Sequence, residues 1–319
     1  MAKKLLVTGA SGFVGRELCK HLVSTGYEVI GVTRSDRADL PPGAILHRCN
    51  LEKDFLGDSL LRDVDCIVHL AGQAHGKGGE DHQELDHFRQ VNVDVTLRLA
   101  KAALDSGVRR FVFVSSIGVH GAITDGRPIS EQAPFNPESP YAVSKMEAEL
   151  ALIRLFEEEG ESELTIVRPP LVYGDQAPGN FGKLLKLARM GIPLPLGRCS
   201  NRRNIISLSQ LAAFMAVCID HPAAGNETFV VAEESPVSTS DMVRALRAGM
   251  RRSAGLFPVP QWLMSSLLKF VGKRGMYIQL FCDLEIDGSK ARKKLGWVPK
   301  SGSIEQLEEI GKRYADSLD

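Results

Sequence analysis

The sequence lacks a net charge, a long hydrophobic run and a secretory signal. Its 319 residues include 39 Lys and Arg and 39 Asp and Glu, so its formal net charge is zero. Such a balanced chain has no general attraction for nucleic acid or an anionic membrane, and any charged partner must be recognised locally. No stretch reaches the roughly 18 consecutive apolar residues of a transmembrane segment. The apolar run that starts at Leu5 is too short for a signal peptide.

The sequence also lacks a metal motif and a disulfide framework. Its six cysteines are scattered, without a C-x-x-C pair: Cys19, Cys49, Cys66, Cys199, Cys218 and Cys282. No histidine cluster accompanies them at metal-ligand spacing. A chain of this length that is 44% apolar can form a hydrophobic core that is stable without disulfide bonds. We therefore predict reduced thiols, a cytoplasmic location and no metal site.

What the sequence does contain is a repeated alternation of short apolar runs and helical stretches. The predicted strands are 4–10, 27–33, 44–50, 65–72 and 109–116, followed later by 164–170 and 227–233. The clearest helices between them are 15–26 and 92–107, and the second stops at Gly107. Continuous apolar strands alternating with helices predict an α/β fold, in which a doubly wound parallel sheet is covered on both faces.

Three glycines follow the first predicted strand and open the first predicted helix. Gly9, Gly12 and Gly15 have the spacing G-x-x-G-x-x-G. Gly9 permits a tight turn, Gly12 permits a close approach to a pyrophosphate, and Gly15 permits close helix-to-strand packing. The free amides and the positive end of the helix then face the phosphates. This position in the sheet predicts nucleotide binding.

Five motifs in a fixed order resemble the extended short-chain dehydrogenases/reductases, in the branch of nucleotide-sugar epimerases and reductases. They are VTGASGFVG at 7–15, HLAG at 69–72, VFVSS at 112–116, YAVSK at 141–145 and RPPLVYG at 168–174. The resemblance covers nearly the whole chain and implies a Rossmann-type domain with a smaller, mainly helical substrate domain. It implies that the dinucleotide is held by Gly9, Ser11, Gly12, Phe13, Val14, Gly15, Arg34, Asn50, Leu51, Leu70, Ala71, Gly72, Tyr141, Lys145 and Pro169.

The chain divides where its composition changes. We expect a dinucleotide-binding domain from 1–168 and 203–232, and a substrate-binding domain from 169–202 and 233–319. Within the second, the stretch 256–272 has the apolar and basic composition of a membrane-surface helix. Its two prolines and modest length favour a packed cap instead.

The end of the second predicted strand bears on the choice of dinucleotide. A carboxylate there accepts the ribose hydroxyls of NAD, whereas an arginine accommodates the 2′-phosphate of NADP. The chain has Thr33 and Arg34 at this point, which favours NADP(H), although Asp36 nearby keeps NAD(H) open. Asn50 stands where the family has an adenine-binding aspartate, and its amide oxygen can accept the same hydrogen bond.

The catalytic candidates lie on a predicted helix and at a predicted strand end. Ser139 caps the helix and places Tyr141 and Lys145 at i and i+4, with Cβ atoms about 6 Å apart. A lysine so close, together with the positive nicotinamide, is expected to lower the pKa of the phenol. Tyr141 could then exchange a proton with an oxygen of the substrate. Ser116, at the end of 109–116, can hydrogen-bond that same oxygen. The resemblance gives all three the role of hydride-transfer residues.

The resemblance also limits the reaction. Dehydratases of the family have an Asp-Glu pair after the catalytic Ser or Thr, and this chain has Ile117 and Gly118 there. Oxidation or reduction at C4 of a hexose remains. Asn180 matches a sugar-nucleotide contact and Arg203 a diphosphate contact, while His75 is a further candidate beside the sugar.

The function that these residues predict is an NADPH-dependent reductase of a UDP-linked, N-acetylated 4-keto-6-deoxyhexose, serving surface-polysaccharide precursor synthesis. A UDP-hexose 4-epimerase with bound NAD is the enzymatic alternative. A dinucleotide-sensing protein that kept the fold without the chemistry is the non-enzymatic one. A homodimer is compatible with the sequence.

Overall fold

Seven parallel strands form the centre of the protein. The computed structural model describes residues 2–35, 38–74, 81–300 and 302–317. The strands are β1 Lys4–Thr8, β2 Glu28–Thr33, β3 Ala44–Arg48, β4 Cys66–His69, β5 Arg110–Val114, β6 Glu163–Arg168 and β9 Glu227–Val230. Their order is β3-β2-β1-β4-β5-β6-β9, and each neighbouring pair is parallel. The predicted doubly wound sheet is confirmed, with 227–233 providing its edge strand.

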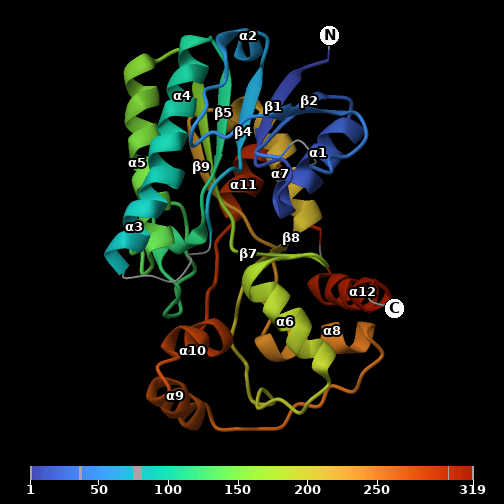
Figure 1. Cartoon of the computed structure of the whole chain (residues 1–319). Helices are drawn as coiled ribbons and strands as arrows, with labels where there is room; N and C mark the ends of the chain where they lie inside the picture. Colours follow the sequence, from blue (N-terminus) through green and yellow to red (C-terminus); the bar gives the residue numbers. More distant parts are fainter. Residues whose placement is uncertain (1, 36–37, 75–80, 301, 318–319) are drawn as a thin grey trace.

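Helices cover both faces of the sheet (Figure 1). On one side α1, Phe13–Ser24, packs with α7, Leu208–Asp220, over a core that includes Leu18, Leu22 and Met215. On the other side α4, Val95–Asp105, and α5, Pro140–Glu159, enclose a second core. Both cores meet in the strands, whose side chains alternate between the two faces.

A smaller body of helices, called the second body below, lies beyond the carboxyl ends of the strands (Figure 1). It contains α6 Gly179–Met190, α8 Thr239–Gly249, α9 Gln261–Phe270, α10 Arg274–Phe281 and α12 Ser303–Asp316. A two-stranded parallel sheet that the sequence analysis missed connects it to the rest, β7 Leu171–Tyr173 with β8 Ile205–Ser207. The short α11, Ser289–Leu295, lies instead against β9 and contributes Ala291 and Leu295 to the core beneath α1 and α7.

The helix predicted at 92–107 extends further toward the N-terminus than expected. Helix α3, Asp81–Arg89, runs into a π-helical turn, η1 Gln90–Asp94, and this turn runs directly into α4. The predicted helix therefore begins at Asp81 rather than at 92. Single π-helical turns within α-helices frequently occur at functional sites. Asn92, in this turn, is fully buried.

The remaining elements are short. They are α2 Asp58–Leu61 and two 3₁₀ turns, η2 Ile117–His120 and η3 Pro222–Ala224. In the described part of the chain, no helix has both the length and the apolar composition needed to cross a bilayer.

The turn between β1 and α1 depends on close backbone contacts. Gly9 has φ +66°, a conformation that favours glycine. A Cβ on Gly15 would lie 2.2 Å from the carbonyl oxygen of Gly9 and 2.7 Å from Cα of Ala10. Helix α1 can approach β1 this closely only because position 15 has no side chain.

We predict that Gly15→Ala lowers the free energy of unfolding by about 1–3 kcal/mol, because the added methyl group must displace backbone that cannot give way. Urea unfolding followed by circular dichroism measures the change. Gly275→Ala is the matched control, since a Cβ there meets nothing within 4 Å. Equal stability of the Gly15→Ala variant and the unmodified protein would show that α1 can move away from β1 at no cost.

Candidate active site

The N-terminus of α1 forms a cradle at the carboxyl end of β1. The helix begins after Gly12, and no side chain of the described residues caps it. A Cβ on Gly12 would lie 3.1 Å from the carbonyl oxygen of Gly9, so a side chain would crowd the turn. Ser11 and Gly12 are exposed, whereas Phe13 and Val14 are partly buried. Uncapped amides next to bare backbone fit a pyrophosphate group, the part of a dinucleotide that a helix N-terminus binds.

The segment after β4 packs directly against this turn. A Cβ on Gly9 would lie 2.9 Å from the backbone nitrogen of Ala71 and close to the carbonyl carbon of Leu70. The amide of Ala71 donates to the Thr8 hydroxyl at 3.1 Å. A Cβ on Gly72 would lie 3.6 Å from Nζ of Lys145. The glycine turn, the segment 70–72 and Lys145 are therefore neighbours.

The carboxyl end of β2 presents a cation. Thr33 is buried, and its hydroxyl donates to the carbonyl oxygen of Ser35 at 2.6 Å. The Arg34 side chain is 76% exposed and makes a 3.4 Å ion pair with Glu52. No carboxylate occupies positions 33–35; Asp36 lies outside the described residues.

The predicted adenine-side residues are engaged in a local turn. The Asn50 side-chain oxygen accepts a hydrogen bond from the Glu52 amide at 3.2 Å, and the Leu51 carbonyl accepts one from Arg98. A carbonyl-type oxygen has a second lone pair, so Asn50 can still accept a further hydrogen bond.

Helix α5 begins as its sequence predicts. Ser139 is the N-cap, and its hydroxyl accepts from the Ala142 amide at 3.2 Å; Pro140 is the first helical residue, and Gly160 ends the helix with φ 67°. The capped start fixes the turn that carries Tyr141, whose ring meets the edge of Phe88 at a centroid distance of 6.1 Å. Tyr141 is thus held in place by both backbone and ring contacts.

Lys145 lies one turn further along α5 and is buried. Its Nζ donates to the carbonyl oxygen of Val114 at 2.9 Å, at the end of β5. The ammonium also lies 4.6 Å from the centroid of the Phe113 ring, a cation–π contact. Helix α5 is therefore joined to the strand end that leads to Ser116.

Ser116 follows β5 and caps the 3₁₀ turn η2. Its Oγ accepts from the Gly118 amide at 3.1 Å, so its proton is left to donate elsewhere. The hydroxyl interacts with the Tyr141 phenol and lowers its pKa. Ser115, by contrast, is buried, which supports Ser116 as the candidate. The amide of Ile117 donates to the carbonyl oxygen of Pro169, which brings the end of β6 to the same place.

Burial shifts the pKa values of Tyr141 and Lys145 in opposite directions. Burial raises the pKa of Tyr141 to about 12 and outweighs the Ser116 contact. Burial also lowers the pKa of Lys145 to about 8, against an opposing effect of the Glu149 charge. In the chain by itself desolvation is the largest effect on this pKa, and the expected lowering by Lys145 together with the nicotinamide stays a prediction. The phenol is neutral near pH 7 and is a proton donor.

A buried ion pair that the sequence analysis missed lies behind these residues. Arg168, at the end of β6, donates from Nε to Glu149 of α5 at 3.0 Å, and from Nη2 at 2.5 Å. Its Nη1 lies 2.9 Å from Nε2 of His120, in η2. Burial lowers the pKa of His120, so the neutral ring donates from Nδ1 to the carbonyl oxygen of Pro134 and accepts from Arg168. No spacing rule pairs residues 19 apart in sequence, on a helix and the following strand.

Asn92 is a second positioning residue that the sequence analysis missed. Its side-chain oxygen accepts from the Gln73 amide at 2.8 Å, while its nitrogen donates to the Gln73 carbonyl and to the Ser144 hydroxyl, each at 3.0 Å. The π-turn aims this side chain between the segment after β4 and α5. The only signal in the sequence is a lone amide in an apolar helix.

Of the predicted substrate residues, Asn180 lies in the second body and Arg203 contacts it. Asn180 is exposed in the first turn of α6. The Arg203 guanidinium is partly buried and donates to the carbonyl oxygens of Cys282 at 2.8 Å and Ile278 at 3.3 Å. Among the described residues it forms no ion pair, whereas Arg202 pairs with Glu285. A partly buried, unpaired guanidinium suits a phosphate group. His75 lies outside the described residues.

Known proteins share both the sequence pattern and the fold. The profile of the NAD dependent epimerase/dehydratase family matches residues 5–232. UDP-glucose 4-epimerase of Vibrio cholerae is 36% identical over 322 residues, covering 98% of this chain and 96% of that protein.

Two solved structures superpose on almost the whole chain. UDP-glucuronic acid 4-epimerase from Bacillus cereus in complex with NAD has a TM-score of 0.79 at 24% identity, covering 99% of this chain and 97% of that one. MoeE5 in complex with UDP-glucose and NAD has a TM-score of 0.78 at 26% identity, covering 99% and 100%. At 24% and 26% identity, these similarities show a shared fold.

We predict that Glu149→Gln lowers the free energy of unfolding by about 3–5 kcal/mol, because it leaves the buried Arg168 charge uncompensated. The same change removes the charge that raises the Lys145 pKa, so that pKa falls below about 8. Chemical denaturation measures the first effect, and titration of the lysine by NMR measures the second. Glu147→Gln is the control, since Glu147 pairs with Arg89 at a more exposed site. A loss no larger than that of the control contradicts the prediction.

Proposed function

The chain belongs to the NAD dependent epimerase/dehydratase family, and we propose that it is an NADPH-dependent reductase acting on the 4-keto group of a UDP-linked, N-acetylated 6-deoxyhexose. Membership makes it an NAD(P)-dependent enzyme of nucleotide-sugar chemistry. A place in surface-polysaccharide precursor synthesis and a cytoplasmic location belong to the same proposal. The observation that carries the reductase assignment is the exposed Arg34 at the end of β2, in a segment 33–35 without a carboxylate.

The cofactor proposal follows from charge. A 2′-phosphate carries negative charge that a carboxylate at the end of β2 would repel and that a guanidinium binds with two parallel hydrogen bonds. Among the described residues, Arg34 makes a 3.4 Å ion pair with Glu52, and most of its side chain is exposed, so it can turn toward a phosphate. A consumed and released NADP(H) fits a reductase, whereas an epimerase retains its dinucleotide.

The catalytic proposal assigns one role to each side chain. Tyr141 is neutral near pH 7 because burial raises its pKa to about 12, so it donates its proton to O4 of the sugar. Ser116 donates a hydrogen bond to the same oxygen, because its own oxygen is engaged by the Gly118 amide. Lys145, held on the carbonyl of Val114, positions the nicotinamide ribose and stabilises the phenolate that forms. When bound, NADPH supplies the hydride for C4.

The side chains after Ser116 favour this reaction over dehydration. Ile117 is 4% exposed and apolar, and Gly118 has no side chain, so neither can transfer a proton. Elimination of water from a sugar needs an acid and a base beside the reacting carbons. On the substrate side, we assign the diphosphate to Arg203 and a sugar-nucleotide contact to Asn180.

A UDP-hexose 4-epimerase is the second candidate. It is favoured by the 36% identity, over almost the whole chain, to a protein named UDP-glucose 4-epimerase. Ser116, Tyr141 and Lys145 would serve that reaction equally well, since it also passes through a 4-keto sugar. The two candidates differ in cofactor turnover, which a single assay resolves.

The test is to incubate the purified protein with NADPH and a UDP-4-keto-6-deoxyhexose, and separately with UDP-glucose. We expect one NADPH to be oxidised for each 4-keto sugar reduced, and Tyr141→Phe to lower kcat by at least about 100-fold. Tyr314→Phe is the control and keeps its activity. Conversion of UDP-glucose to UDP-galactose without net use of a dinucleotide would establish the epimerase instead.

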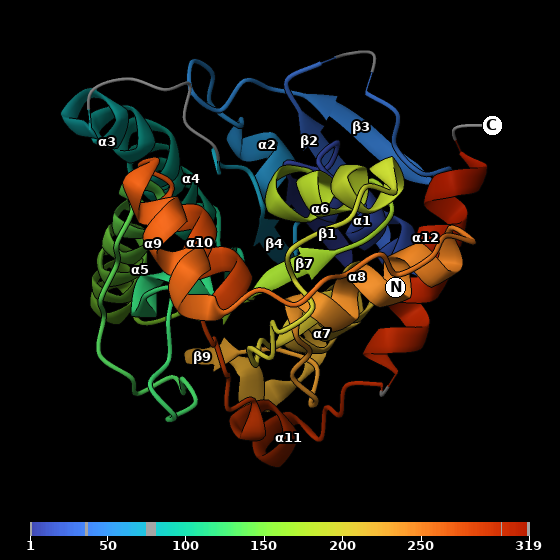
Figure 2. The same cartoon turned by 90° about the horizontal axis from the view of Figure 1, so that it is seen from below.

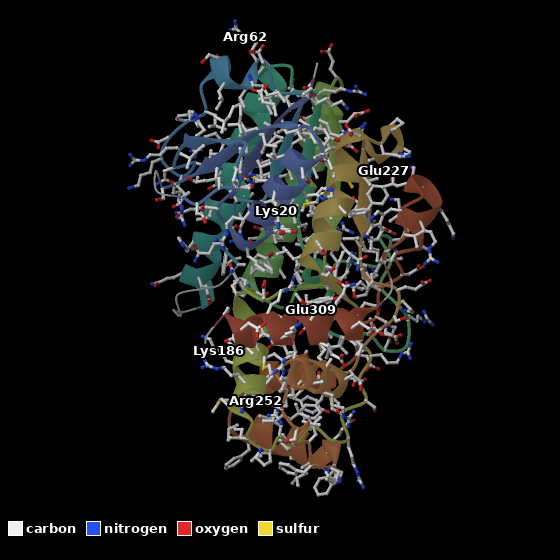
Figure 3. The ribbon with its side chains drawn as sticks, turned by 90° about the vertical axis from the view of Figure 1, so that its right-hand side faces the viewer. Lys20, Arg62, Lys186, Glu227, Arg252 and Glu309 are labelled. Atoms are coloured by element: carbon white, nitrogen blue, oxygen red, sulfur yellow. The ribbon has the colours of Figure 1, made fainter. Side chains whose placement is uncertain are left out.

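We predict that Arg34→Ala raises KM for NADPH about 10- to 100-fold and leaves KM for NADH nearly unchanged, because only NADPH carries the 2′-phosphate. Steady-state kinetics with each dinucleotide measure the ratio. Arg62→Ala is the control. Arg62 lies at the opposite end of the molecule from the second body of helices, and so away from the carboxyl ends of the strands (Figure 3). Parallel increases in both KM values would mean that Arg34 does not recognise the phosphate.

A further inference from the structure

Helix α9 has six apolar side chains among its ten residues, yet only one side of it is packed. Leu268 is 8% exposed and joins the core of the second body, with Met264 packed beside it. The other side is open to solvent, with exposed fractions of 71% for Trp262, 44% for Leu263, 52% for Leu267 and 90% for Phe270. A surface helix of a soluble protein normally turns its apolar side chains toward the core. The sequence-based expectation of a packed cap therefore holds for one face only.

The exposed apolar side chains of α9 lie on one side of the helix. At 100° per residue, positions 262, 263, 267 and 270 fall within a sector of about 140°, which also contains the small Ser266. Val271, directly after the helix, is 51% exposed, and Met276 of the adjoining α10 is 43% exposed. A contiguous apolar face of this kind marks an interaction site in a soluble protein, unlike single exposed residues.

The same part of the chain is strongly basic. Residues 251–280 contain five basic residues and no Asp or Glu, although the whole chain has no net charge. All five are exposed: Arg251, Arg252, Lys269, Lys273 and Arg274. Basic residues that flank an exposed apolar helix face are the pattern of helices that lie in the interface of an anionic bilayer.

The location of α9 leaves this face accessible. Helix α9 packs chiefly on α10, and both lie at the end of the molecule away from the sheet (Figure 1). Seen from below, the two helices lie on the side nearest the viewer (Figure 2). Arg252 is near this same end, opposite Arg62 (Figure 3). A flat surface can therefore reach α9 without meeting the helices that cover the sheet.

We propose that α9, with the basic residues around it, docks this protein onto an anionic lipid surface. Trp262, Leu263, Leu267 and Phe270 enter the acyl boundary, while Lys269, Lys273 and Arg274 contact the headgroups. Charge selects this occupant over a second copy of the chain. A two-fold contact of this face with itself would oppose five positive charges to five others, with no acidic residue in 251–280 to compensate.

Flotation of the purified full-length protein with vesicles tests the proposal. We expect it to float with vesicles containing phosphatidylglycerol, to stay behind with pure phosphatidylcholine, and to be released by high salt. The chain has two tryptophans, and Trp297 packs on Phe214 at a centroid distance of 4.9 Å. The emission shift to shorter wavelength on vesicle binding should therefore come from Trp262. It disappears in Trp262→Phe, which still floats.

Matched double variants separate this face from general effects. Trp262→Ser with Phe270→Ser should weaken vesicle binding at least about tenfold, and Lys269→Glu with Lys273→Glu should do the same. The apolar control is Phe55→Ser with Val298→Ser, which are 73% and 60% exposed in the unmodified protein. The charge control is Lys53→Glu with Lys293→Glu. All four replaced pairs are exposed, so thermal unfolding should show that each variant keeps its fold.

Three results would overturn the proposal. The first is failure of the unmodified protein to float with anionic vesicles. The second is an equal loss of binding in the control variants. The third is a dimer in analytical ultracentrifugation that Trp262→Ser with Phe270→Ser converts to a monomer, together with no flotation, because α9 would then be a contact between copies of the chain.

Discussion

The buried ion pair between Arg168 and Glu149 is the contact on which the geometry of the site depends. It joins the end of β6 to α5, and through His120 it reaches the turn that follows Ser116. Both charges are removed from water, so the loss of either side chain would leave a buried, unpaired charge. The pair therefore holds together β6, η2 and α5, the last two of which adjoin Ser116 and carry Tyr141.

The glycine turn that faces the cofactor is built on close backbone contacts. Where Gly9 and Gly15 lack side chains, α1 approaches β1, and the segment 70–72 approaches the turn between them. That segment is held on its other side by Asn92, which also bonds to Ser144 in α5. One continuous set of contacts thus runs from the glycine turn to the catalytic helix, which explains how a dinucleotide could span both.

Most of the fold could be predicted from the sequence, because its signals are local. Alternating apolar runs and helices indicated the seven strands, and Ser139, Pro140 and Gly160 marked both ends of α5. The parts that escaped prediction depend on distant partners. The strands β7 and β8 have three residues each, too few to show a period, and the π-turn at Asn92 follows from what that side chain binds. In α9 the buried Leu268 and the exposed Leu263 and Leu267 are the same residue type, so the sequence does not distinguish them.

The sequence by itself determined the residue types and spacings: three glycines at a strand-to-helix turn, Tyr141 and Lys145 one helical turn apart, and Arg34 in a segment 33–35 without a carboxylate. The tertiary structure alone decided how the pKa values of Tyr141 and Lys145 shift. Burial of Tyr141 raises its pKa, against the lowering that its spacing from Lys145 suggests. Spacing along a helix fixes which side chains are neighbours, but the cost of removing a charge from water depends on everything packed around it.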